Sequence, residues 1–204
     1  MDHNAKANSL LVPQAKQDTL FERGFKTWCE NISVTIRKRL GVFPQSPLSA
    51  YDLALRLGVK VWKLENVPGL SIAALSHLSS VNGNEWSAVT ISSNNQIIII
   101  VNPTHSAARQ SSDLMHELAH ILKKHEDSQV FLSETGYALR SFNEKQEAEA
   151  DWFAGTLLLP RTALSYCTYH NVPLTQILSD YAVSRDLYNY RLRKTGVKRQ
   201  FGKR

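Results

Sequence analysis

The chain has 204 residues, of which 43% are hydrophobic and 21% are charged, a balance typical of a folded globular protein rather than a disordered one. The formal net charge is +6, but basic residues crowd into the stretch after Tyr190, so the excess is local. The longest aliphatic run, residues 97–101, is far shorter than the ~20 residues needed to cross a bilayer. We therefore expect no membrane partner. The polar first residues lack the apolar core of a secretory signal, which favours a cytoplasmic protein.

The N-terminal part of the chain is predicted to be helical. Apolar residues recur every three or four positions from Leu20 to Leu40 and stop at Gly41, which predicts an amphipathic helix. Ser49 followed by Asp52 predicts the cap of a second, shorter helix that ends at Gly58. We assign residues 1–45 to an N-terminal tail and helix whose role the sequence does not reveal.

A small, mainly antiparallel sheet is predicted next. Residues 59–64, 85–91 and 96–101 are β-branched or aromatic runs, and the turn-prone residues 92–95 join the last two. The strand at 96–102 comes directly before the following helix. It could therefore form the rim of a cleft and pair with an extended substrate, or it could be an internal strand.

Helical patterns fill most of the remaining chain. Apolar spacing returns after Pro103 and ends near two lysines at 123 and 124, which complement the dipole of that helix. A less regular stretch covers about 126–140. Ser141 and Glu144 then predict a capping box that opens a helix through about Thr156. Shorter helices are expected at 161–169, 174–181 and 185–194, with Ser184 as a cap and Gly196 as a stop.

The helix after Pro103 carries the string His116-Glu117-Leu118-Ala119-His120, which is an HExxH motif. A four-residue step on a helix turns only ~40° past a full circle, so both imidazoles project from one face and can hold one metal ion. Glu117 lies ~100° round from His116. Its carboxylate is thus placed beside the ion, where it can take a proton from bound water as a general base.

A catalytic zinc ion usually has three protein ligands and one open position for water. The acidic helix downstream offers four candidates for the third ligand, Glu144, Glu147, Glu149 and Asp151. Glu147 and Asp151 share one helix face, so Glu147 could bind the metal while Asp151 accepts the outer N–H of a ligating histidine. Glu149 points in roughly the opposite direction. The alternative is that the acidic helix is only a solvated face.

HELAH followed by EAEADWFAGTLLLP resembles the ImmA/IrrE family of metallopeptidases, which combines an HExxH helix with a downstream E-x-E-A-(N/D)-x-F-A-x-x-L-L-x-P pattern. It is also similar to the broader gluzincins, in which a glutamate from an ExxxD helix completes the site. The resemblance implies His116, His120 and Glu147 as zinc ligands, Glu117 as the base and Asp151 as the partner of a ligand. It further implies a protein substrate, a helix-turn-helix repressor of a mobile element or stress regulon.

Other residues that could take part are less clearly indicated. His125 is off the row of ligands and is interpreted as a surface or helix-end residue. It is also a candidate for stabilising the oxyanion, together with Tyr137 and His170. His77 and His105 are weaker candidates. The two cysteines, Cys29 and Cys167, are far apart in the chain and are expected to be buried, reduced thiols.

The residues after Leu174 suggest two short helices broken near Ser184, followed by positive charge, which is the outline of a helix-turn-helix-like module. Direct DNA binding is possible but not favoured, because the basic excess is a tail rather than a full face. We predict an α+β, gluzincin-like fold with a metallopeptidase core at 46–165 and a helical C-terminal segment at 166–204. The alternative function is a DNA-associated regulator whose zinc site is structural or inactive.

Overall fold

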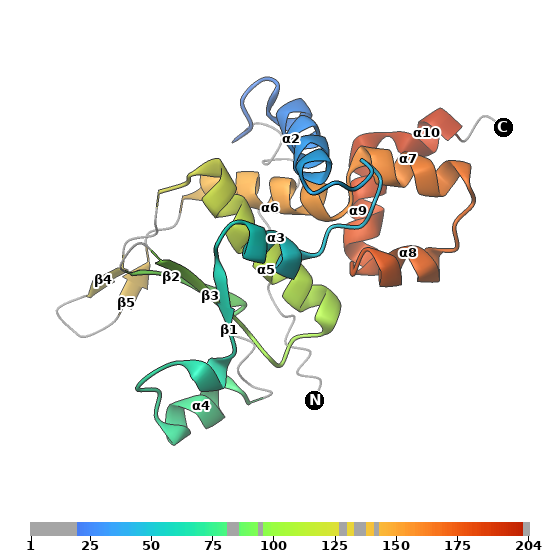
Figure 1. Ribbon diagram of the computed structural model, residues 1–204. Coiled ribbons are helices and arrows are strands. Elements are labelled where there is room, and N and C mark those ends of the chain that lie inside the picture. The colour runs from blue at the N-terminus through green and yellow to red at the C-terminus, as the bar shows by residue number, and fades with distance from the viewer. Residues whose placement is uncertain are drawn as a thin grey trace, which may run out of the picture.

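The computed structural model describes residues 20–80, 86–93, 96–126, 130–132, 138–140 and 143–201. It has the predicted mixture of helices and a small sheet, with the sheet beside two long helices, α5 and α6, and the C-terminal helices at the far end of α6 (Figure 1). Among the described residues, no helix combines the length and the apolar character that a membrane span requires.

The sheet consists of β1 (Lys60–Trp62), β2 (Ala88–Ser93) and β3 (Gln96–Val101), in the order β1-β3-β2. β2 runs antiparallel to β3, whereas β1 runs parallel to it, so the sheet is mixed. β3 is the central strand and has neighbours on both sides, which explains why its sequence is almost uniformly aliphatic. The alternative that this strand forms the rim of a cleft is therefore wrong, and the edge strands of the sheet are β1 and β2.

The two faces of the sheet bury different sets of side chains, because successive residues of a strand point to opposite sides. Ile99 packs into the main core, which lies on the side of α3 (Ala50–Arg56) and α5 (Ala107–Lys123). Ile98 and Ile100 form a second cluster with residues of the 3-10 turn η1 (Leu64–Asn66) and of α4 (Ile72–Leu78). α4 was not predicted from the sequence. β1 and β3 thus form a partition between two apolar clusters.

The N-terminal helix is shorter than predicted. α2 begins at Phe25 and ends at Arg39, because Gly24 before it adopts a left-handed conformation with φ 91° that interrupts the helical pattern. Phe21 lies before this break, and its ring packs edge-on against Trp152 with the centroids 5.5 Å apart. Phe21 therefore packs against the core from the bend before α2 and not from the helix.

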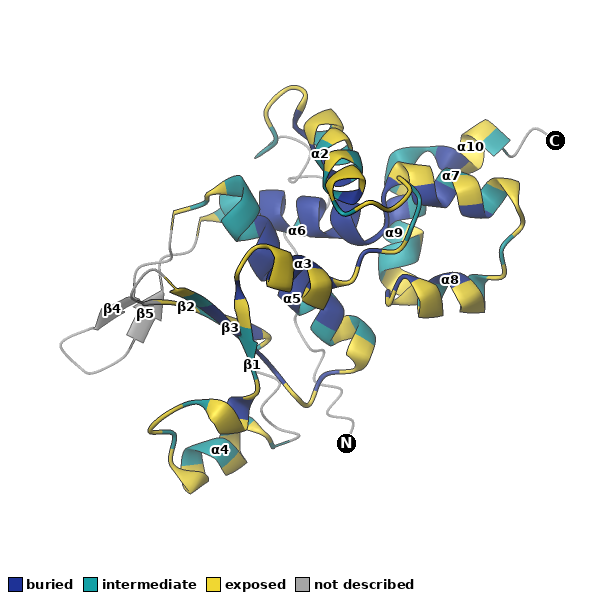
Figure 2. Cartoon of the chain, in the orientation of Figure 1, coloured by how far each residue is buried: buried dark blue, intermediate teal, exposed yellow. Residues whose placement is uncertain are grey.

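α5 and α6 (Glu144–Leu158) pack side by side and form the centre of the molecule. From Ala148 to Leu158 every residue of α6 except Asp151 is buried, which makes α6 the darkest helix of Figure 2. The cap of α6 is Asn143, whose side chain accepts hydrogen bonds from the amides of Lys145 and Gln146. The capping box predicted at Ser141 is thus replaced by this cap, and Ser141 itself lies outside the described residues.

Two buried arginines satisfy the last carbonyl groups of α6, which have no partner within the helix. Nη2 of Arg37 donates to the carbonyl oxygen of Leu157 at 2.7 Å, and Nε of Arg191 donates to that of Leu159 at 3.1 Å. Both arginines have no exposed surface, and Arg191 also pairs with Glu30 at 2.6 Å. The helix dipole adds to the attraction, since cations are favoured at a helix C-terminus.

The C-terminal elements are α7 (Arg161–Tyr169), α8 (Leu174–Asp180), α9 (Arg185–Thr195) and α10 (Val197–Phe201). The predicted start and stop of α9 are confirmed, because Ser184 caps it and Gly196 ends it with φ 70°. Val197 and Phe25 belong to the same core cluster as Leu114, so this core draws on all three predicted segments. The division into three segments itself stays a prediction.

The stretch predicted to be irregular contains a two-stranded antiparallel sheet, β4 (Val130–Leu132) and β5 (Ala138–Arg140), so that prediction is wrong for these residues. Cys29 and Cys167 are free and buried, as expected. Burial raises the pKa of the Cys29 thiol to about 12, which keeps it protonated and unreactive.

Candidate metal centre

The structure brings together the two histidines of the HExxH motif and one glutamate of α6. Nε2 of His116 lies 3.0 Å from Nε2 of His120 and 3.2 Å from Oε2 of Glu147, and the third side of this triangle is 3.6 Å. A tetrahedral ion with bonds of about 2.0–2.1 Å holds its ligands about 3.3–3.4 Å apart. The three donor atoms therefore already have the spacing of three corners of a zinc site.

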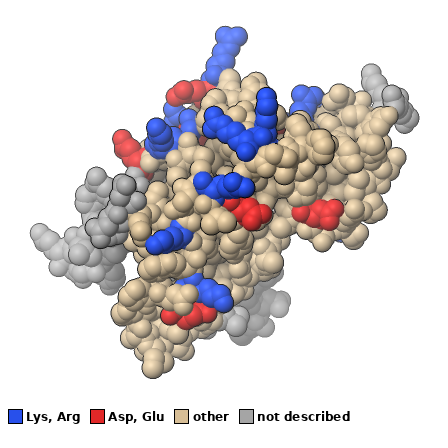
Figure 3. Space-filling model, viewed as in Figure 1, with Lys and Arg blue, Asp and Glu red and all other residues tan. Residues whose placement is uncertain are grey.

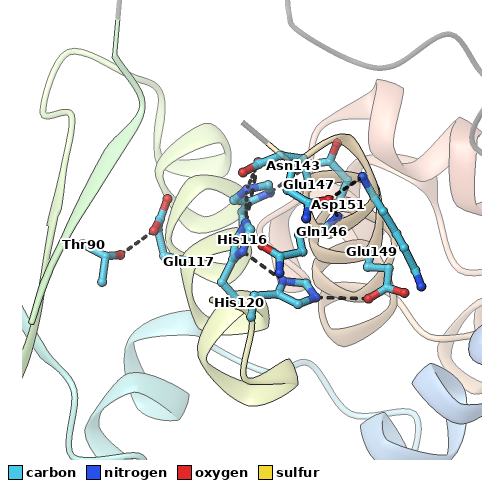
Figure 4. Close-up of polar contacts among 11 residues, drawn as sticks. Thr90, His116, Glu117, His120, Asn143, Gln146, Glu147, Glu149 and Asp151 are labelled. Atoms are coloured by element: carbon cyan, nitrogen blue, oxygen red, sulfur yellow. Dashed lines mark hydrogen bonds and ion pairs between the residues drawn. The ribbon is translucent and has the colours of Figure 1, made fainter. Parts of the chain in front are cut away.

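The local sequence explains why these donors converge. His116 and His120 are four residues apart on α5, so both point toward α6, and Glu147 points back from the first turn of α6 (Figure 4). All three residues are partly exposed, which leaves the site accessible from solvent. Within the described part of the chain, this is the only group of His, Cys, Asp and Glu side chains close enough to hold a metal ion.

Asp151 orients the first histidine. Its Oδ1 lies 2.9 Å from Nδ1 of His116, and because a carboxylate only accepts, the imidazole carries its proton on Nδ1. Nε2 of His116 is then the nitrogen that can either give its lone pair to an ion or take up a second proton, and it faces Glu147. Asp151 thus lies outside the donor triangle and on the same helix as the third donor.

The electrostatics of the cluster favour a cation. Burial lowers the pKa of His116, but hydrogen bonds to Asp151 and Glu147 and the charge of Glu117 outweigh it and raise the pKa to about 10. Burial likewise raises the pKa of Glu147, but the neighbouring imidazoles of His116 and His120 hold it well below its usual range. In the protein without metal a proton would occupy the place of the cation. Three donors surrounded by acceptors are suited to a divalent ion.

Glu117 lies on a different side of α5 from the two histidines. It is 9% exposed and points toward β2, where the hydroxyl of Thr90 donates to its Oε2 (Figure 4). The described contacts do not join Glu117 directly to the donor triangle, but its charge contributes to the raised pKa of His116. Thr90 was not identified from the sequence, because nothing local marks a threonine 27 residues upstream as the partner of the motif glutamate.

His125 and Glu149 form a second group of contacts beside the donor triangle. Nδ1 of His125 is 3.0 Å from Nδ1 of His120, and Nε2 of His125 is 3.1 Å from Oε2 of Glu149. Of the two interpretations of His125, the surface one is wrong, because its side chain is 6% exposed, and the helix-end one is right, because His125 directly follows the C-cap of α5. Burial lowers the pKa of His125 in spite of its bond to Glu149. Glu149 does not join the donor triangle, but it is connected to His120 through the imidazole of His125.

The other candidates lie elsewhere. His170 is exposed at the end of α7, where its ring packs against two tyrosines. His77 is exposed on α4, and His105 is buried with Nδ1 2.6 Å from Oδ2 of Asp113. Tyr137 lies outside the described residues. The structure thus brings neither His170 nor His77 to the site, and no oxyanion donor is assigned.

An HExxH helix that joins a glutamate from a second helix around one ion defines a metallopeptidase centre. The family model of the IrrE N-terminal-like domain, peptidase family M78, matches residues 78–193. Because this match covers more than half of the chain, the protein belongs to that family, which confirms the resemblance drawn from the sequence. No curated protein matches the chain.

Proposed function

We propose that the protein is a zinc-dependent endopeptidase of the gluzincin type that acts in the cytoplasm. The observation that carries this proposal is the triangle formed by His116, His120 and Glu147, with sides of 3.0, 3.2 and 3.6 Å. A structural zinc site is usually closed by four protein ligands, whereas a catalytic site keeps one position for water. The described residues contribute three donors, which favours the catalytic type.

The chemistry proposed for this site uses few groups. A zinc ion would supply Lewis acidity toward water and the carbonyl group of the scissile peptide. Glu117, next to His116 in the chain, takes the proton from the attacking water and later gives it to the leaving amine. Thr90 engages only Oε2 of Glu117, so the other carboxylate oxygen can accept that proton. The same hydrogen bond holds the carboxylate in one orientation.

The edge strand β2 offers a place for an extended substrate. Among the described residues β2 pairs only with β3, so its other edge presents backbone groups that a peptide can bind as an added strand. Thr90 belongs to this strand and touches Glu117. A peptide paired with β2 would therefore pass close to the general base. This assigns to β2 the role that one interpretation of the sequence gave to β3.

The substrate class proposed is a helix-turn-helix repressor of a mobile element or stress regulon, on the strength of the family resemblance. The rival is a DNA-associated regulator with a structural or inactive zinc site, supported chiefly by the basic C-terminal residues. Arg191 is one of these residues, and it is buried against Glu30. On the face drawn in Figure 3, basic side chains gather at the top, over α2, and acidic ones are interspersed with them. We therefore favour the peptidase.

The experiment compares the wild type with Glu117→Gln and Glu147→Ala. Each purified chain is analysed for zinc and incubated with a library of peptides from helix-turn-helix repressors, and the products are identified by mass spectrometry. We expect Glu117→Gln to keep about one zinc per chain and to lose cleavage, because the base is separate from the ligands. Glu147→Ala should lose zinc as well. Unimpaired cleavage by Glu117→Gln would defeat the assignment of the base.

A further inference from the structure

We propose that His125, held by Glu149, is the positioning residue for the second metal ligand, His120. This inference rests on the proposed zinc site but goes beyond its three ligands. It assigns a role to the buried contacts between His120 and His125, 3.0 Å, and between His125 and Glu149, 3.1 Å. These contacts form a chain of hydrogen bonds that runs from the donor triangle into the interior.

The end of α5 explains how His125 reaches His120. On a continuous helix a residue five positions on would lie about 140° away, on another face. Here Lys124 adopts a left-handed conformation with φ 57°, its amide donates to Ile121, and the amide of His125 donates to the carbonyl oxygen of His120 at 3.0 Å. This pattern of two bonds is a Schellman motif, which turns the chain back over the last turn. It returns the imidazole of His125 to His120.

The hydrogen bonds fix the proton positions in this chain. The carboxylate of Glu149 can only accept, so Nε2 of neutral His125 donates to it and Nδ1 of His125 accepts. Nδ1 of His120 must then be the donor in the contact between the two rings. Nε2 of His120 is consequently left with its lone pair, and it points toward Nε2 of His116 and toward Glu147. The tautomer that a metal requires is thus imposed from outside the ligand set.

Glu149, which ends this chain of hydrogen bonds, is itself held in place by neighbouring side chains. Glu149 is 4% exposed, and its Oε2 also lies 3.3 Å from Nζ of Lys123. The ammonium group of Lys123 in turn lies over the rings of Phe25 and Trp28 of α2, at 5.2 and 5.3 Å from the centroids. His120 thereby has its own outer carboxylate, reached through His125, just as His116 has Asp151. The N-terminal helix contributes to this support, although it lies outside the residues matched by the family model.

The test measures metal affinity and geometry instead of activity alone. Zinc affinity is determined by competition with a chromophoric chelator, and the visible absorption spectrum of the Co²⁺-substituted protein reports the ligand geometry. Variants are His125→Ala, His125→Gln and Glu149→Leu, and the matched control is His170→Ala, which removes an exposed histidine from α7. Glutamine retains one acceptor and one donor, so it can replace both hydrogen bonds of His125.

We expect His125→Ala and Glu149→Leu to weaken zinc binding about 10- to 100-fold, the usual effect of losing an outer partner of a ligand, and to change the Co²⁺ spectrum. His125→Gln should recover part of the affinity, and His170→Ala should match the wild type. If the wild type binds zinc and His125→Ala has the same affinity and Co²⁺ spectrum as the wild type, this inference is overturned while the proposed function stands. A wild type that binds no zinc would instead defeat the proposed function. If His125→Ala and His125→Gln lost the same amount of zinc affinity and the Co²⁺ spectrum did not change, His125 would act only by packing, and the inference would be wrong.

Discussion

Nδ1 of His116 donates to Oδ1 of Asp151 at 2.9 Å, while Nε2 of the same ring faces Glu147, four residues earlier on α6. One turn of α6 therefore supplies both a donor for the metal and the acceptor that orients another donor. Asp151 is also the one residue between Ala148 and Leu158 that is not buried. Its polarity is needed for the site and not for packing.

Asp151→Ala is expected to lower zinc affinity about 10- to 100-fold, because His116 loses the acceptor that fixes its tautomer. Asp151→Asn retains a carbonyl oxygen and should keep most of the affinity. The measurement is a competition titration with a chelator, and Glu144→Ala, on the first turn of the same helix, is the control. If Asp151→Ala bound zinc as tightly as Glu144→Ala, the role given to this contact would be wrong.

Thr90→Val is expected to reduce the rate of cleavage about 10- to 100-fold while leaving the zinc content unchanged. Valine has nearly the same shape as threonine but cannot donate to Glu117, so the base loses its orientation, and small misplacements of reacting groups are costly. Thr90→Ser should retain most of the rate. The control is Ser92→Ala, two residues along β2. Rates are measured at saturating substrate, and a normal rate in Thr90→Val would show that Thr90 does not position the base.

The donor triangle could be predicted from the sequence because its information is local. The spacing of His116 and His120 fixes their common face on a helix, and the spacing of Glu147 and Asp151 does the same on α6. The choice of Glu147 among the four acidic candidates came from the family resemblance, and the meeting of the two helices had to be assumed. The contacts between α5 and α6 confirm that meeting.

The remaining partners depend on geometry that residue spacing does not encode. His125 was interpreted as a surface or helix-end residue, but the left-handed conformation of Lys124, with φ 57°, turns the chain so that its imidazole meets His120. The left-handed position after a helix is usually a glycine, and here it is a lysine, so the sequence carried no recognisable signal for this turn. Thr90 reaches Glu117 only through the packing of β2 on α5, and the central position of β3 follows from its parallel pairing with β1. Such long-range pairings are not visible in one sequence.

Arg191→Met is expected to lower the free energy of unfolding by about 3–5 kcal/mol, because it leaves Glu30 and the end of α6 without their buried cation. Arg193→Ala, two residues away and exposed, should change it by no more than about 0.5 kcal/mol. Urea denaturation of the metal-free proteins provides the measurement. The comparison also bears on the DNA-binding alternative. A loss of DNA binding in an Arg191 variant would reflect unfolding, whereas a loss in Arg193→Ala would indicate a direct contact between the exposed side chain and DNA.

The metal-free protein is expected to lose stability as the pH rises from about 6.5 to about 10. The pKa of His116 is raised from 6.5 to about 10 by its acceptors, so its contribution is complete below 6.5 and is lost as the pH passes through 10. The pKa of Glu147 is lowered from 4.5, so its contribution is complete above that value and is lost on acidification. Both contributions are therefore complete only between about pH 4.5 and 6.5.

Zinc should reverse the trend on the alkaline side, because it binds deprotonated ligands and its affinity rises as His116 loses its proton. The melting temperature is measured against pH with a chelator and, in parallel, with zinc. The gap between the two curves should widen from pH 6 to pH 8, and His116→Ala should remove both the gap and the alkaline loss attributed to that residue. A metal-free protein that becomes more stable between pH 7 and 9 would contradict the charge distribution described for the site, since the lowered pKa of His125 raises stability mainly as the pH approaches 6.5 and little above it.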